Sequence, residues 1–103
     1  TIGVVATNAT LTTVQASRLA IMGQDGVTRA VFPAHLPQDG DAIFAVSTEE
    51  VPAPASMDEW TEILHAASLV TARAVARGVY EAGSMEGQHA FPTWHERFGC
   101  GVQ

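Results

Sequence analysis

Two short apolar segments, residues 2–7 and 41–48, set the main constraint on how this chain can fold. Residues 2–7 are almost wholly apolar and are followed by Asn8-Ala9-Thr10, a pattern typical of a strand buried on both faces of a sheet. Residues 41–48 follow a loop rich in proline and glycine and predict a second strand. A two-stranded sheet is marginal alone and leaves both edges open. We therefore expect another chain to supply the missing strands.

A helix is predicted between these two strands. Thr12 and Gln15 have the spacing of a capping box, which favours a helix start at this point. Small and apolar residues then recur at helical spacing along one face, which allows close approach to a neighbouring layer. The Asp25-Gly26 pair either ends this helix or lies inside it, at a cost of about 1 kcal/mol relative to alanine. The sequence leaves both possibilities open.

A long, alanine-rich helix is predicted over residues 57–82, opened by a second capping box at Ser56 and Glu59. The tail after Gly83 has little periodicity, although its aromatic residues within 91–98 could dock as an apolar clasp. Strands and helices with continuous apolar faces, in this order, predict an incomplete layered fold of the α+β class.

The domain organisation follows from length and composition. A chain of 103 residues, 47% of them hydrophobic, is the size of one ordinary domain. No repeat or internal boundary divides residues 1–103. We distinguish a strand-helix-loop-strand part, residues 1–50, from the long helix and tail of residues 51–103.

The charge excludes some classes of partner. The formal net charge is −6, with five arginines and no lysine, so no basic surface is available for nucleic acid or an anionic membrane. No apolar run approaches the roughly 20 residues needed to span a bilayer, and no secretory signal is recognisable. The single cysteine, Cys100, cannot form an internal disulfide. We expect a soluble, cytoplasmic protein that binds neither nucleic acid nor a membrane.

The chain begins at Thr1 rather than at a methionine. One explanation is removal of the methionine or a chain boundary, and the other is cleavage of a precursor. An N-terminal threonine combines a hydroxyl nucleophile with an α-amine whose ordinary pKa, about 7.7–8.0, lets it act as a base near neutral pH. The strand behind Thr1 and the incomplete sheet favour cleavage.

Asp39-Gly40-Asp41 places two carboxylates two residues apart at the entrance to the second strand. If strand conformation begins there, both side chains point to the same side and can hold the amine and hydroxyl of Thr1. Two like charges close together would also raise one carboxyl pKa. The alternatives are an ordinary turn or a cation site, but a calcium loop would need further oxygen ligands that the sequence lacks.

The remaining polar candidates are weaker. The histidines, which are His35, His65, His89 and His95, show no metal-ligand spacing and have no cysteine partners. We therefore predict no metal and no cofactor. His35 alone lies near the acid pair and could line a site. Asn8 is as consistent with a turn as with a substrate contact.

Several segments in order resemble one family. They are Thr1 to Ala9 (TIGVVATNA), Leu11-Thr12, Pro33-Ala34-His35 and Asp39 to Thr48 (DGDAIFAVST). They resemble the small, C-terminal (beta) subunit of the DmpA-type aminopeptidases and of the nylon-oligomer hydrolase NylC. The resemblance covers residues 1–50 well and the long helix more loosely.

The resemblance implies an N-terminal-nucleophile hydrolase, made as one precursor that cuts itself before a serine or threonine. It further implies a four-layer αββα sandwich shared with a large (alpha) subunit, and an assembly of several alpha/beta pairs. Thr1 then matches the nucleophile, and Asp39 and Asp41 match the two residues that orient it. In the aminopeptidase branch the nucleophile is Ser, and the two orienting positions hold Ser and Glu. In the nylon-oligomer branch the nucleophile is Thr and both orienting positions hold Asp, as in this chain. Some relatives carry Thr-Thr-Ile where this chain begins Thr-Ile. If a threonine stood before Thr1, the nucleophile assignment would shift to it.

The family's other functional groups, a Lys and an Asn, lie in the large subunit. Our first hypothesis is therefore an autoprocessed amide hydrolase acting on linear amides, either 6-aminohexanoate (nylon) oligomers or N-terminal peptide bonds. The alternative is a non-catalytic subunit or interaction module that docks a partner through its apolar helices.

Overall fold

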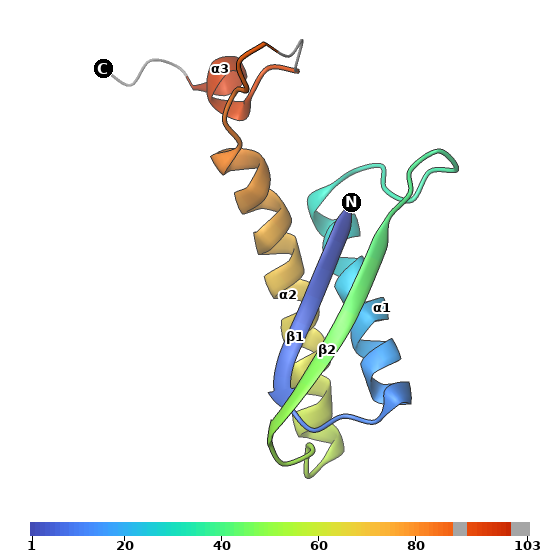
Figure 1. The fold of residues 1–103 in the computed structure, drawn as a ribbon. Coiled ribbons are helices and arrows are strands. Elements are labelled where there is room, and N and C mark those ends of the chain that lie inside the picture. Colours follow the sequence, from blue (N-terminus) through green and yellow to red (C-terminus); the bar gives the residue numbers. More distant parts are fainter. Residues whose placement is uncertain (88–90, 100–103) are drawn as a thin grey trace.

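The computed structural model describes residues 1–87 and 91–99 and shows an α+β arrangement, as the sequence predicts. In chain order the elements are β1 (Ile2–Ala9), α1 (Thr13–Ala30), β2 (Ala42–Val51), α2 (Met57–Glu81) and α3 (Trp94–Phe98). β1 and β2 pair in parallel, and α1 is the crossover that parallel pairing requires. Both long helices lie on one face of this two-stranded sheet (Figure 1).

The start of α1 is confirmed at atomic detail. The Thr12 hydroxyl accepts a hydrogen bond from the backbone N–H of Gln15 at 3.2 Å, and the Gln15 side chain accepts one from the backbone N–H of Thr12 at 2.9 Å. Two amides that helix geometry leaves without partners are thereby satisfied, which orients the chain as it leaves β1.

The Asp25-Gly26 pair lies inside α1, which continues to Ala30. A Cβ at Gly26 would stand 2.6 Å from Thr71 Cβ and also against the backbone oxygen of Ser68, so only glycine fits where α1 crosses α2. Gly23, one turn earlier, plays the same role toward the sheet, because a Cβ there would stand 2.9 Å from a methyl group of Val5. Close packing on two sides explains why two glycines are tolerated within one helix.

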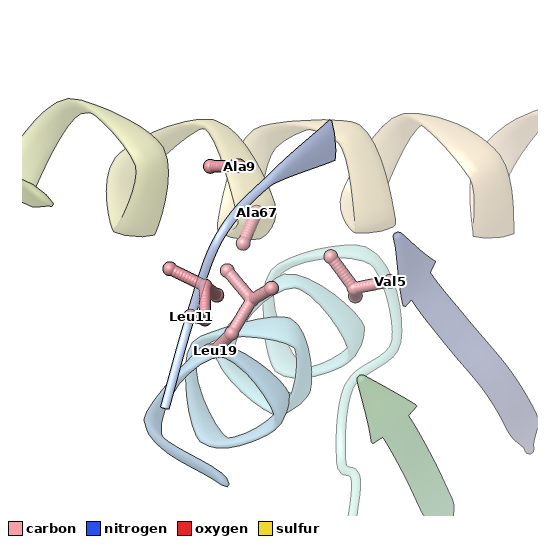
Figure 2. Close-up of a cluster of buried hydrophobic side chains, with 5 residues drawn as sticks. All are labelled: Val5, Ala9, Leu11, Leu19 and Ala67. Carbon is pink, nitrogen blue, oxygen red and sulfur yellow. The ribbon is translucent and has the colours of Figure 1, made fainter. Parts of the chain in front are cut away.

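The core lies between the sheet and the two long helices. One cluster of buried apolar side chains consists of Val5, Ala9, Leu11, Leu19 and Ala67, and Figure 2 shows them converging from β1, the segment after it, α1 and α2. Leu19 is 1% exposed. Full burial of one leucine side chain is worth about 1.5–3 kcal/mol, so this small cluster anchors α1 to the sheet.

None of the residues that the structure describes covers the opposite face of the sheet. Exposed fractions are 80% for Ile2, 63% for Val4, 60% for Phe44 and 44% for Val46. The prediction that the first strand is buried on both faces is therefore wrong for this chain as it stands. The apolar run suits two covered faces, but α1 and α2 supply a cover for only one of them.

The second helix forms as predicted, although its capping differs in one contact. The Ser56 hydroxyl accepts from the backbone N–H of Glu59 at 3.2 Å. The Glu59 carboxylate, however, accepts from the backbone N–H of Ala55, at 2.7 Å, rather than from that of Ser56. The helix ends at Glu81, one residue before the predicted end.

The tail docks on the end of α2 through an aromatic cluster. The Tyr80 ring lies 4.9 Å from that of Trp94 and 4.6 Å from that of His95, measured between centroids. Phe91 remains exposed, so only part of the predicted clasp touches the helix. His89 and Cys100 lie outside the described residues. Within residues 1–87 and 91–99, no helix is long and apolar enough to cross a bilayer.

Candidate active site

Thr1 is held at the edge of the sheet by two contacts. Its carbonyl oxygen accepts a hydrogen bond from the backbone N–H of Ala42 at 2.8 Å. Its α-ammonium donates to Oδ1 of Asp41 at 2.6 Å. The side chain of Thr1 is 37% exposed, whereas that of Asp41 is 3% exposed. Asp41 therefore fixes the amine, while the hydroxyl-bearing side chain of Thr1 stays accessible.

The parallel register explains why residues 40 positions apart meet. Ile2 pairs with Ala42, so the residues just before them, Thr1 and Asp41, start neighbouring strands at the same edge of the sheet. An antiparallel hairpin would have placed the two starts at opposite ends. The crossover through α1 thus assembles this pair of residues.

The second oxygen of the Asp41 carboxylate is also engaged. Its Oδ2 lies 2.8 Å from Nδ1 of His35, and Nε2 of that ring lies 3.2 Å from the hydroxyl oxygen of Thr28. The Thr28 hydroxyl is in turn 3.2 Å from the backbone oxygen of Gln24, one turn earlier in α1. A chain of four contacts therefore connects the backbone of α1 to the amine of Thr1.

These contacts shift two pKa values in opposite directions. The hydrogen bond from the Thr1 ammonium, with a smaller contribution from His35, lowers the pKa of Asp41 to about 2 although desolvation opposes the shift. The hydrogen bond to Asp41 raises the pKa of the Thr1 amine above its ordinary value of 8.0, again against desolvation, and the negative charges of Asp41 and Asp39 add to the rise. The amine in this chain is consequently more protonated at neutral pH than an ordinary N-terminus.

Asp39 occupies a different position from the one expected. β2 begins only at Ala42, so the Asp39-Gly40-Asp41 segment precedes the strand and its carboxylates do not share a strand face. The backbone N–H of Asp39 donates to the carbonyl of Leu36 at 2.8 Å, which makes a turn. Asp39 acts on Thr1 through its charge, and Asp41 makes the direct contact.

The structure separates the two weaker candidates. His35 lies in the site, on Asp41. Asn8 lies near the other end of β1, roughly 20 Å from Thr1 at the usual rise per residue of a strand, so it belongs to no common site with Thr1. Thr28 was not predicted, because nothing in its local sequence distinguishes it from other exposed helix residues.

An apolar groove of about 620 Å³ opens beside Thr1. It runs between β1 and the second half of α2, and besides Thr1 its lining includes Val4, Val70, Ala74 and Val79. Among the residues that the structure describes, no group of three His, Cys, Asp or Glu side chains is placed to hold a metal ion. The polar contacts at this end of the sheet instead centre on the amine of Thr1.

Comparison with known proteins identifies the family of this chain. The sequence pattern of Peptidase family S58 matches residues 1–91. Since this match covers most of the chain, the chain belongs to peptidase family S58, and the resemblance to the DmpA-type aminopeptidases is confirmed at the level of the family.

Curated relatives extend well beyond this chain. An uncharacterized aminopeptidase of Mycobacterium leprae (strain TN) is 42% identical over 112 residues, which cover 99% of this chain and 29% of that protein. An uncharacterized aminopeptidase of Mycobacterium tuberculosis (strain ATCC 25618 / H37Rv) is 36% identical over 106 residues, covering 95% of this chain and 30% of that protein. The chain thus spans about 30% of the length of the curated relatives it matches.

Proposed function

We propose that this chain carries the nucleophile of an autoprocessed N-terminal-threonine amide hydrolase. The observation that carries the proposal is the 2.6 Å contact between the α-amine of Thr1 and Asp41, made at an edge where Thr1 is already held by Ala42. This contact fixes the one base that an N-terminal nucleophile needs, and it leaves the residue open to an incoming substrate. Membership of a peptidase family and relatives named aminopeptidases support hydrolysis of an amide bond.

The proposed reaction uses only groups of Thr1 for its proton transfers. The free amine takes the proton of the Thr1 hydroxyl as Oγ attacks the carbonyl carbon of the substrate amide. The resulting ammonium gives that proton to the leaving nitrogen as the C–N bond breaks, which leaves an ester on Oγ. Water, deprotonated by the same amine, then attacks the ester carbonyl carbon. The C–Oγ bond breaks, the ammonium returns its proton to Oγ, and the acid is released. Asp41 orients the amine throughout, and Asp39 adds negative charge nearby.

Because the pKa of the Thr1 amine is raised, we propose that the rest of the site lowers it again. Two carboxylates favour the protonated amine, which cannot accept the hydroxyl proton. A cation close to Thr1 would lower the amine pKa again. The family resemblance assigns a Lys and an Asn to the large subunit, and the Lys would have this effect while the Asn would stabilise the oxyanion.

The uncovered sheet surfaces support completion by a larger partner from the same precursor. The outer face of the sheet is apolar, and the groove beside β1 exposes apolar side chains of α2. Packing that outer face against a second sheet would give the four-layer sandwich, and several such pairs would form the assembly. We propose as substrate a linear amide, either a 6-aminohexanoate oligomer or the N-terminal bond of a peptide, because the groove that reaches Thr1 is lined by successive residues of β1 and is mainly apolar.

The test uses the full-length precursor with Thr1→Ser and Thr1→Ala. Thr1→Ser keeps a hydroxyl and should still cleave itself and hydrolyse an aminoacyl p-nitroanilide or a 6-aminohexanoate dimer. Thr1→Ala should do neither. In the unmodified protein, mass spectrometry should find Thr1 as the new N-terminus and, after rapid quenching, an acyl adduct on its peptide.

Two outcomes would reject the proposal. Hydrolysis by a folded Thr1→Ala protein would show that another group is the nucleophile. A mature protein without a free N-terminal threonine would lack the α-amine that serves as the base. That result would favour the alternative, a docking module without catalysis.

A further inference from the structure

The carboxylate of Asp41 is locked by two neighbours rather than one. Oδ1 receives the Thr1 ammonium and Oδ2 receives Nδ1 of His35, at 2.6 and 2.8 Å. The Asp41 side chain is 3% exposed, so the His35 contact satisfies an oxygen with little access to water. With both oxygens engaged, the carboxylate cannot rotate away from the amine without losing a hydrogen bond.

The ring of His35 is itself held on its far side. Because an ionised carboxylate only accepts hydrogen bonds, Nδ1 must carry a proton. Nε2 then either accepts the hydroxyl proton of Thr28 or, if protonated, donates to that hydroxyl, which in turn donates to the carbonyl of Gln24. The Thr28 hydroxyl can therefore partner Nε2 either as a donor or as an acceptor.

The backbone at His35 has an uncommon, left-handed conformation. Its φ is +61°, in the left-handed region that glycine adopts readily and that, among other residues, Asn, Asp and His adopt most often. Residues with a β-carbon are uncommon in this region, and they cluster at functional sites. At this position the contacts that hold the residue are those to Asp41 and Thr28.

We propose that His35 is a positioning residue for the nucleophile: its Nδ1–H fixes the carboxylate of Asp41, which in turn aims the α-amine of Thr1. The inference rests on the proposed function, since it concerns how the base of that reaction is oriented. Thr28, on α1, contacts Nε2 of the ring and supports its orientation from the far side. The charged groups that face the amine are Asp41 and Asp39, and His35 acts on it only through the first of these.

The test compares two substitutions that both accept a left-handed backbone. His35→Gly removes the ring and the donor without backbone strain. His35→Asn places an amide N–H close to where Nδ1 stands and tolerates the same φ. Each is made in the full-length precursor, checked for self-cleavage and thermal unfolding, and assayed with the aminoacyl p-nitroanilide across a range of pH.

His35→Gly should lower kcat on the pH plateau about tenfold or more with little change in KM, as expected when a catalytic group loses its orientation. The acid limb of the kcat/KM profile should also move to lower pH. Without His35, Asp41 makes a weaker hydrogen bond to the Thr1 amine, so the pKa of the amine falls toward its ordinary value. His35→Asn should stay within about threefold of the unmodified enzyme and keep that limb in place. Thr28→Val should lie between the two.

Unchanged kcat and pH profile in His35→Gly would overturn the inference. So would an equal loss in a folded, cleaved His35→Asn, because that would make the ring rather than its donor the requirement. If His35→Gly does not accumulate, His35→Asn decides alone, and a loss beyond about tenfold rejects the role. Thr1→Ala in the same series keeps the two proposals apart: an active Thr1→Ala rejects the mechanism itself, whereas an inactive one beside a normal His35→Gly rejects only the positioning role.

Discussion

Both faces of the β1–β2 sheet carry apolar side chains, but only one face is buried. Val5 and Ala9 on the inner face lie buried under α1 and α2, while Val4 and Phe44 on the outer face stand open to solvent. Alternating residues of one strand thus have opposite environments. The outer face therefore carries apolar side chains like those of a covered face, although none of the described residues covers it.

The largest effect is expected from the outer face. In the full-length protein, Phe44→Ala should lower the free energy of unfolding by about 3–5 kcal/mol, because we propose that a second sheet buries this ring there. Denaturant unfolding measures the loss, with Val14→Ala on the exposed side of α1 as the control. A loss no greater than that of the control would mean that the outer face stays bare.

On the inner face, Leu19→Ala should cost about 2–5 kcal/mol, since the side chain is wholly buried and its removal leaves a cavity between α1 and the sheet. The same unfolding experiment checks it. A cost below about 1 kcal/mol would show that the core can collapse around the smaller residue, and would weaken the contrast between the faces.

The junction of the two covering helices should be less sensitive than either face. Gly26→Ala should destabilise by about 1–3 kcal/mol, because the added methyl group meets the backbone of α2 and forces the helices apart. Gly83→Ala, where a Cβ would meet nothing within 4 Å, is the matched control and should change little. Equal midpoints for the two variants in thermal unfolding would contradict the close crossing.

The smallest effect should come from the ion pair at the sheet edge, and its sign depends on pH. The lowered pKa of Asp41 stabilises the fold above the ordinary value of 3.8, and this contribution is lost as pH falls toward about 2. The raised pKa of the Thr1 amine stabilises the fold below 8.0, and that contribution is lost as pH rises through the raised value.

The stability difference between the unmodified protein and Asp41→Asn should therefore be widest near pH 5–7 and shrink at both extremes. Denaturant midpoints measured across pH check this, with Asp25→Asn on the exposed side of α1 as the control. A difference that is constant with pH would show that Asp41 contributes by packing and not through its charge. Added salt should also reduce the difference, because Thr1 is partly exposed.

Local patterns in the sequence were enough to locate most of the fold. The capping box at Thr12, the apolar run of β1 and the alanine-rich α2 each depend on neighbours within a few residues, and the structure places them close to where they were expected. The Asp25-Gly26 pair could not be decided in the same way. Whether glycine ends a helix or lies at a helix crossing depends on what packs against it, here Thr71 from another element.

For the candidate site, too, some features follow from the sequence and others only from the tertiary structure. Thr1, with its amine and hydroxyl, and the acidic character of Asp39-Gly40-Asp41 follow from the sequence alone, because these are properties of the residues themselves. Only the tertiary structure decided that Asp41 makes the contact and Asp39 does not, and that His35 and Thr28 lie behind it. The physical reason is that a parallel register and a left-handed loop residue bring together groups whose separation along the chain carries no local signal.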